Sequence, residues 1–459
     1  KGFLFDAATH FYPLLGNSET LTGKLLRELQ TPTEWIKMDP VDQFHFPGCE
    51  TFAAPAAFAD YILKLKRWFP REAAAIDAYF AELRQAYMYG LLHYFKGVSN
   101  EYVDRLEHWT VAAKLDAHFT DPKLKAILMA DTPHWGSLPN RVSYIFDAML
   151  RMSYFLGNYY PRGGSQKFAD DLGRGIEACR GSVLRCTAAE AIRVKSGAVC
   201  GVRIRTVSRR EPEWFDFEAP VAVSNADALH TYRDLLPPEH RDRWVLDRIE
   251  AMTPSHSCFM MHIGLRGMDP ERLAAAEGYY WSCYDSQDAV RTAFKVFVPT
   301  HFDPKVAPPG CQALIVQKLT ALRFSDVADW GAAKAAVEAE IMERLRGILP
   351  GIDRHIVVRL TASPHTLYRF TGNRDGAMLG WEMSPGQLGS ARLPFVTPIR
   401  NLYLTGHWTH PGGGITPVIV SAQRAAKAIL TGKDGQNDLA TRYFAFHASS
   451  ASAAEGVLT

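Results

Sequence analysis

The chain of 459 residues exceeds the ~250–300 residues at which a single hydrophobic core stops growing, so we expect two domains. Hydrophobic residues make up 47% and charged residues 22%, with a formal net charge of +2, a balance that is typical of a globular protein and gives no reason to expect a nucleic-acid partner. Seven widely spaced cysteines and apolar runs far shorter than ~20 residues exclude a compact disulfide framework, a CxxC metal site and a membrane-spanning helix, so we expect a cytoplasmic protein that at most lies against a membrane.

The first part of the chain is predicted to be mainly helical. Residues 2–6 have the pattern of a strand, with neither an initiator methionine nor a signal-peptide layout before it, and we expect the natural protein to begin earlier. From residue 18 to 156 apolar residues recur at three- and four-residue spacing, which predicts a helical cap. The clearest helices of the first part are expected at 58–69, 73–94, 141–155 and 166–179.

The second part is predicted to alternate between strands and a few helices. A β-rich stretch covers residues 182–224, and a further sheet, largely antiparallel, is expected between 241 and 359 with an amphipathic helix at 330–348. The strands of that sheet are expected at 257–265, 293–298, 312–319 and 355–360. A last strand at 401–405 leads through a glycine-rich turn into a helix at 417–430, and residues 433–459 form a small, polar, mobile tail.

The most informative stretch of the sequence is Thr405-Gly-His-Trp-Thr-His-Pro-Gly-Gly-Gly-Ile-Thr-Pro. A strand runs into four close-set glycines and then into a helix, for which we expect Thr416 as N-cap and Pro417 at the first helical position. Glycine permits positive φ and a close approach of the backbone to a flat ligand, and a helix N-terminus stabilises negative charge. The alternative is a tight structural turn that contacts no ligand.

This stretch resembles the C-terminal flavin-contact motif of the phytoene desaturase and carotenoid isomerase family, within the amine oxidase superfamily. Five weaker matches follow the family's order along the chain: residues 2–6, 160–164, 189–192 with 201–202, 224–227 and 371–376. The resemblance implies an α/β fold in which a discontinuous Rossmann-like FAD-binding domain comprises 1–15, 158–235 and 396–432. A mixed-sheet substrate domain with the helical cap would comprise 16–157 and 236–395.

The resemblance also implies a cofactor, a set of contacts and a substrate class. FAD would carry the chemistry, and a long hydrophobic polyene or isoprenoid would be desaturated, saturated or isomerised between cis and trans. The positions that match the family's FAD contacts are Ala189, Asn225, Ala226, Gly406, His407, Gly413, Gly414, Ile415 and Thr416. The alternative functions are those of an amine or protoporphyrinogen oxidase-like flavoenzyme and of a cofactor-free lipid-binding or scaffold protein.

Two departures from the family pattern concern FAD binding. No GxGxxG turn opens the chain, and Gly173-Arg-Gly-Ile-Glu-Ala178 is rejected as a substitute because it lies within a predicted helix. His407 stands where the family usually has an acidic residue; when charged, it would attract phosphate.

Other histidines and a basic run give weaker hypotheses. His407 and His410 form an H-x-x-H pair without a nearby carboxylate or thiol, so we expect a structural role and no metal. His10 is a candidate acid or base at the flavin, with a hydrogen-bonded histidine at a domain seam as the alternative. The run 64–69, rich in basic and aromatic residues, fits either a membrane-surface contact or an ordinary solvated face.

Overall fold

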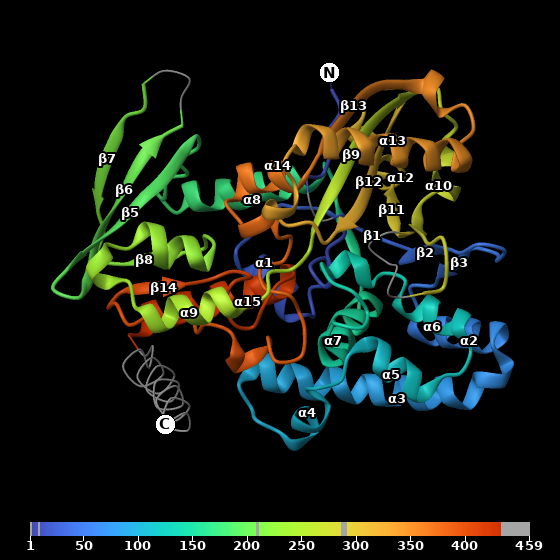
Figure 1. Cartoon of the computed structure of the whole chain (residues 1–459), viewed down its shortest axis with the longest axis horizontal. Coiled ribbons are helices and arrows are strands. Elements are labelled where there is room, and N and C mark those ends of the chain that lie inside the picture. The colour runs from blue at the N-terminus through green and yellow to red at the C-terminus, as the bar shows by residue number, and fades with distance from the viewer. Residues whose placement is uncertain (1, 8–9, 208–210, 286–291, 433–459) are drawn as a thin grey trace.

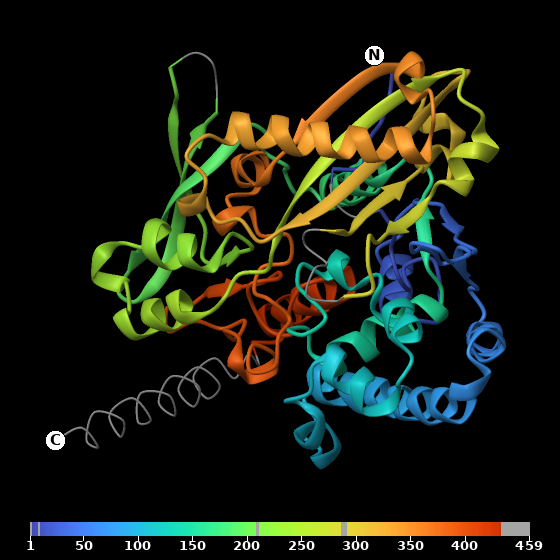
Figure 2. The same ribbon diagram turned by 45° about the vertical axis from the view of Figure 1, so that its right-hand side comes forward.

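The computed structural model describes residues 2–7, 10–207, 211–285 and 292–432 (Figure 1). A helical block and a large sheet lie at opposite ends of the molecule in both views, and helix α15 lies between them (Figures 1 and 2). In the described part of the chain no helix combines the length and the apolar character that crossing a bilayer requires.

The helical block follows the expected positions within a few residues. One difference is that the helix expected at 73–94 ends at Gly90 and continues as a wider π-helical segment, η2 (Leu91–Phe95). The helices of the block are α1 (Leu21–Glu28), α2 (Phe58–Trp68), α3 (Ala73–Gly90), α4 (Glu101–Leu106), α5 (Val111–His118), α6 (Pro122–Met129) and α7 (Tyr144–Phe155). The block is not purely helical, because β1 (Trp35–Lys37), β2 (Asp42–His45) and β3 (Phe52–Ala54) interrupt it, and β1 pairs with β4 (Tyr159–Pro161).

The large sheet has seven strands in the order β13-β9-β12-β11-β10-β2-β3. Its strands outside the helical block are β9 (Ser257–Arg266), β10 (Gly278–Tyr280), β11 (Phe294–Phe297), β12 (Cys311–Thr320) and β13 (Ile356–Ala362). All its pairs are antiparallel except β10 with β2, which confirms a largely antiparallel sheet. Helix α13 (Trp330–Ile348) lies across one face, where it buries Ile341, Met342 and Leu345 (Figure 2).

Two smaller sheets and helix α15 (Ile415–Thr431) complete the fold. Strands β8 (Ala222–Ser224) and β14 (Leu402–Leu404) pair in parallel, and their carboxyl ends therefore meet although they are far apart in sequence. The other sheet is antiparallel and consists of β5 (Thr187–Lys195), β6 (Ala198–Thr206) and β7 (Trp214–Glu218). The remaining helices are α8 (Ser165–Ala178), α9 (Arg243–Ala251), α10 (Pro270–Ala275), α12 (Pro299–Phe302) and α14 (Pro364–Thr371).

The prediction of a strand at residues 2–6 is wrong. This segment runs over the large sheet without joining one: Leu4 N donates to Val306 O at 2.8 Å, and the Phe3 ring packs against Gly264 of β9. Packing on the sheet half-buries Phe3 and Phe5, whereas Leu4 remains exposed, so the segment contacts the sheet through side chains without strand pairing. Gly173 and Gly175 lie inside α8, which confirms that the GxGxxA motif they belong to is not a strand-to-helix turn. The tail expected at 433–459 lies outside the described residues.

Candidate active site

A pocket lies at the N-terminus of α15 and is bounded by the helical block. Its wall has a backbone side, formed by the glycine turn, and a side-chain side, formed mainly by α3, η2 and α7. The lining residues are Phe11, Pro13, Leu14, Tyr87, Leu91, Phe95, His134, Trp135, Phe146, Met149, Leu150, Ser153, Tyr154, Leu379, Gly413, Gly414, Ile415, Thr416 and Pro417. Most are apolar, which is typical of a small-molecule site.

The glycine turn is packed on one side and open on the other. A Cβ on Gly413 would lie 2.5 Å from the carbonyl oxygen of Leu379, and a Cβ on Gly412 would lie 2.9 Å from Met383 Cε. A Cβ on Gly414, by contrast, would meet nothing nearer than Pro417 Cδ at 3.5 Å. Only Gly414 therefore leaves free space beside the main chain for a planar ring, whereas Gly413 is needed for the packing of the turn.

Helix α15 begins two residues earlier than expected. Gly414, with φ of 100°, is the N-cap, and no side chain caps the helix. The prediction of Thr416 as N-cap is therefore wrong, because the glycine backbone makes the sharp entry by itself. Thr416 Oγ1 is instead fully buried without a hydrogen-bond partner among the described residues.

The N-terminus of α15 fits a flavin ring on these observations. The unpartnered Thr416 hydroxyl needs a hydrogen-bond partner from whatever occupies the pocket. The first N–H groups of the helix are not used within the helix and carry a partial positive charge, and no acidic side chain lies in the first turn to neutralise it. A flat, electron-accepting ring with carbonyl groups on its edge has the shape and polarity that these features require.

Three further predicted residues meet at the carboxyl ends of β8 and β14. Gly406 has φ of 92°, and a Cβ there would overlap Oδ1 of Asn225. Ala226 follows Asn225, and the N–H of Gly406 donates to Ser421 Oγ of α15 at 3.2 Å. The strand ends of a parallel pair are a common ligand position in α/β proteins. None of these three residues lines the pocket.

Two other predicted contacts lie away from the pocket. Ala189 is exposed on β5, where it pairs with Ile204. The backbone carbonyl oxygen of His407 accepts a hydrogen bond from Arg392 Nη1 at 2.8 Å. Burial and the nearby charge of Arg392 lower the pKa of the His407 ring to about 4. The ring is neutral at neutral pH, so the positive charge that would attract phosphate is absent there.

The candidate acid or base His10 does not reach the pocket, whereas another histidine lines it. His10 is completely buried, stacks on Phe297 with ring centroids 5.0 Å apart, and contacts Gln317 without lining the pocket. His134 lines the pocket instead. No sequence pattern marks His134, because its position follows from tertiary packing. His410 contacts Arg424, and the described residues contain no group of three or more potential metal ligands.

The helical wall rests on a buried ionic cluster. Arg151 Nη2 lies 2.9 Å from Asp147 Oδ1 and 3.1 Å from Asp131 Oδ1, and all three side chains are buried. Burial raises the pKa of Asp147 to about 6, an effect that Arg151 opposes. Because α7 also carries Phe146 and Leu150 of the pocket wall, the cluster fixes that wall from behind.

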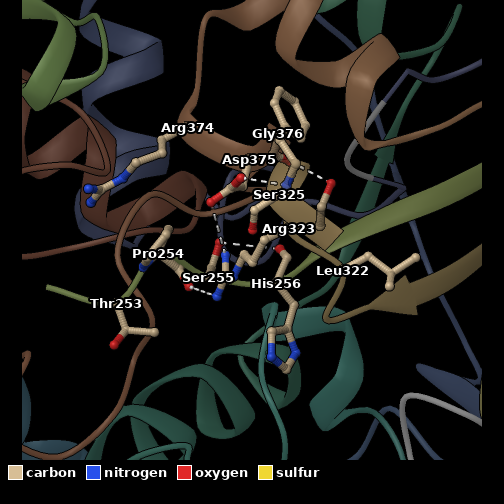
Figure 3. A network of polar contacts seen from close by, with 12 residues as sticks. Thr253, Pro254, Ser255, His256, Leu322, Arg323, Ser325, Arg374, Asp375 and Gly376 are labelled. Carbon is tan, nitrogen blue, oxygen red and sulfur yellow. Dashed lines mark hydrogen bonds and ion pairs between the residues drawn. The ribbon is translucent and has the colours of Figure 1, made fainter. Parts of the chain in front are cut away.

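A network of polar contacts surrounds Arg323, which follows strand β12 of the large sheet (Figure 3). Arg323 Nη2 donates to the carbonyl oxygen of Pro254 at 3.1 Å, and Asp375 accepts from the backbone of residue 324. Next to these contacts, Ser255 Oγ accepts the N–H of Leu379, which lines the pocket, at 2.9 Å. The turn around Asp375 also reaches β8, because Arg374 N donates to Asp227 at 2.8 Å.

The sequence is similar to flavoenzymes over most of its length. Residues 84–430 match the family described as flavin containing amine oxidoreductase. The chain is 24% identical over 452 residues to a phytoene desaturase (neurosporene-forming) of Cereibacter sphaeroides, which covers 93% of this chain and 86% of the relative. It is 26% identical over 461 residues to the all-trans-retinol 13,14-reductase of Rattus norvegicus, which covers 88% and 74%.

Solved structures agree in fold. An oxidoreductase from Methanosarcina mazei superposes with a TM-score of 0.63 at 16% identity and covers 93% of this chain and 89% of that one. Cyclohexylamine oxidase from Brevibacterium oxydans superposes with a TM-score of 0.55 at 14% identity and covers 91% and 86%. The chain belongs to the flavin-containing amine oxidoreductase family, and it is an oxidoreductase whose cofactor is FAD.

Proposed function

We propose that this FAD-dependent oxidoreductase acts on a long apolar polyene held in the pocket at the N-terminus of α15. The observation that carries the proposal is that one pocket combines the open Gly414 backbone with a wall of aromatic and aliphatic side chains. A polyene offers no charge and little polarity, so such a wall binds it through buried apolar area.

The residues of the α15 end would hold the flavin ring. Gly414 leaves room for the ring, and Thr416 Oγ1 with the first N–H groups of the helix supplies polar contacts to its edge. The bound flavin supplies electron and hydride exchange with a carbon–carbon bond. The helical wall excludes water and holds that bond against the ring.

Relatives with different reactions support a polyene substrate. They include a phytoene desaturase, an all-trans-zeta-carotene desaturase and an all-trans-retinol 13,14-reductase. The proposed site serves desaturation, saturation and cis–trans isomerisation equally well, because each needs the same bond held against the same ring.

The amine-oxidase alternative has less support. A protonated amine in an apolar pocket needs a carboxylate partner. No described residue that lines the pocket is Asp, Glu, Lys or Arg.

We further propose a cytoplasmic protein that contacts a membrane at the outer end of the helical wall. Apolar side chains are exposed there at Met88, Tyr89, Leu92 and Val98, next to Leu91 and Phe95 of the pocket. The run 64–69 is a poorer candidate, because Lys64 Nζ turns back to the carbonyl oxygen of Ala53. Such a contact would let an apolar substrate reach the pocket from lipid.

Absorbance spectroscopy and product analysis test this function. The purified protein is expected to show the bands of oxidised flavin, and incubation with a carotenoid or retinoid polyene should shift the absorption of the polyene as double bonds are gained, lost or isomerised. Chromatography of the products identifies which reaction occurs. Flavin-loaded protein that turns over an amine and leaves every polyene unchanged would contradict the proposal.

A further inference from the structure

His134 belongs to two neighbouring pockets. It lies in the short helical turn η3 (Thr132–Trp135) and lines the large apolar pocket described above. It also lines a smaller recess of about 240 Å³, together with Lys295 and Gln317. The imidazole ring of His134 therefore lies between the apolar pocket and a recess that contains the polar side chains of Lys295 and Gln317.

The hydrogen bonds of Gln317 fix which nitrogen of His134 carries the proton. Nδ1 of His134 and Nε2 of His10 each lie 3.1 Å from Gln317 Oε1, and Gln317 Nε2 lies 3.2 Å from Met378 Sδ. A thioether sulfur only accepts, so the amide nitrogen must face Met378 and the amide oxygen must face both rings. Each ring then donates to that oxygen, and Nε2 of His134 is left without a proton.

Both rings are neutral under ordinary conditions. Burial, followed by the nearby Lys295, lowers the pKa of His134 to about 3, and burial with the neighbouring His134 holds the pKa of His10 well below its usual value. His10 Nδ1 is sealed in the interior. No described residue donates a hydrogen bond to Nε2 of His134, although this ring forms part of the pocket wall.

Resting on the function proposed above, we infer that the pocket takes a polyene that bears a hydroxyl group, whose O–H donates to Nε2 of His134. An acceptor beside an apolar pocket is costly to desolvate unless the occupant donates to it. A hydroxyl supplies that donor without a charge. A carbonyl or carboxylate offers only lone pairs, and an ammonium group finds no carboxylate among the described lining residues.

The test compares three probes that differ at one end. All-trans-retinol, its methyl ether and the corresponding hydrocarbon without oxygen are titrated into the flavin-loaded protein, and binding is followed by quenching of tryptophan emission, since Trp135 lies in the pocket wall. The alcohol is expected to bind at least about tenfold more tightly than the ether, because the ether retains the oxygen but cannot donate.

Substitutions test whether the preference for the alcohol over the ether depends on His134. His134→Phe keeps a ring of similar size and removes the acceptor, so the ratio of ether to alcohol dissociation constants should fall to near one. His45→Phe is the matched control: His45 is also half-buried but lies in β2, outside both pockets, and the ratio should stay at the wild-type value. His134→Gln, which restores an acceptor, should recover part of the preference.

The outcomes separate this inference from the proposed function. Equal binding of alcohol and ether by the wild type overturns the hydroxyl inference while the polyene function stands. A preference that survives in His134→Phe also overturns it. Failure of all three probes to bind flavin-loaded protein counts against the polyene function itself.

Discussion

The two sides of the pocket are built in different ways. At the α15 end the wall is main chain, and its shape depends on Gly413 and Gly414 having no side chain. On the opposite side the wall is the surface of α7, supported from behind by the buried Arg151 cluster. Substitutions on the first side should therefore release the ligand, and substitutions on the second side should lower stability.

Gly414→Val gives the largest effect expected on the backbone side. Valine would project into the open space and is strained at φ of 100°, so we expect flavin content below about a tenth of the wild-type value while the fold is kept. Flavin absorbance per protein, with circular dichroism, measures both. Gly197→Val is the matched control, since Gly197 has φ of 71° in the turn between β5 and β6 with nothing near its Cβ position. Full flavin content in Gly414→Val would contradict the placement of the ring.

Arg151→Met tests the side-chain side. It leaves Asp131 and Asp147 buried without their partner, which should lower the free energy of unfolding by about 3–5 kcal/mol. Urea denaturation measures the loss. Flavin content at low temperature should be nearly unchanged, because the α15 end is untouched. A variant that loses its flavin but not its stability would contradict this difference between the two sides of the pocket.

His407, which lies outside the pocket, gives a pH-dependent effect on stability. Its pKa falls from the ordinary 6.5 to about 4 on folding, so the unfolded chain binds a proton more readily between these values, and stability present above pH 6.5 is lost as the pH falls toward 4. In His407→Gln this contribution disappears, and the fall in unfolding free energy between pH 7 and 4.5 should be about 1–3 kcal/mol smaller than in wild type. Urea denaturation of the wild type and the variant at both pH values measures this difference. An equal decrease in unfolding free energy in the two proteins would contradict the prediction.

The smallest effect is expected at the outer end of the helical wall. Exchange of both Met88 and Leu92 for serine should weaken binding to lipid vesicles roughly fivefold by removing exposed apolar area. Co-sedimentation with vesicles measures this. Phe370→Ser is the control, because Phe370 is 80% exposed but lies on α14, and it should leave vesicle binding unchanged. Equal losses in both variants would show that binding is not localised there.

Local patterns in the sequence predicted much of the fold. Helix α13 has the expected bounds, because its apolar spacing and the Pro-Gly after it are local signals. The membership of β2 in the large sheet was not predictable, since it is a four-residue strand whose partner β10 lies more than 200 residues later. The segment 2–6 failed for a related reason: a strand-like pattern does not say whether a sheet edge is available.

The site was predicted in part. The glycine turn and the start of α15 were found because backbone freedom and a helix entry leave a pattern in consecutive residues. Asn225 and Gly406 came from the family resemblance as separate FAD contacts, and their contact with each other was not predicted. His134 could not be found, because its role depends on Gln317, which is 183 positions away in the chain.

The π-helical segment η2 gives the helical wall one residue more than a regular helix of the same length would hold. Leu91 and Phe95 of this segment line the pocket, while Leu92 is exposed. Removal of a single residue here would let the turn close to regular helical geometry without rotating the residues that follow. The wall would then lose one side chain and keep its register, so η2 is the place where this wall tolerates a change in chain length.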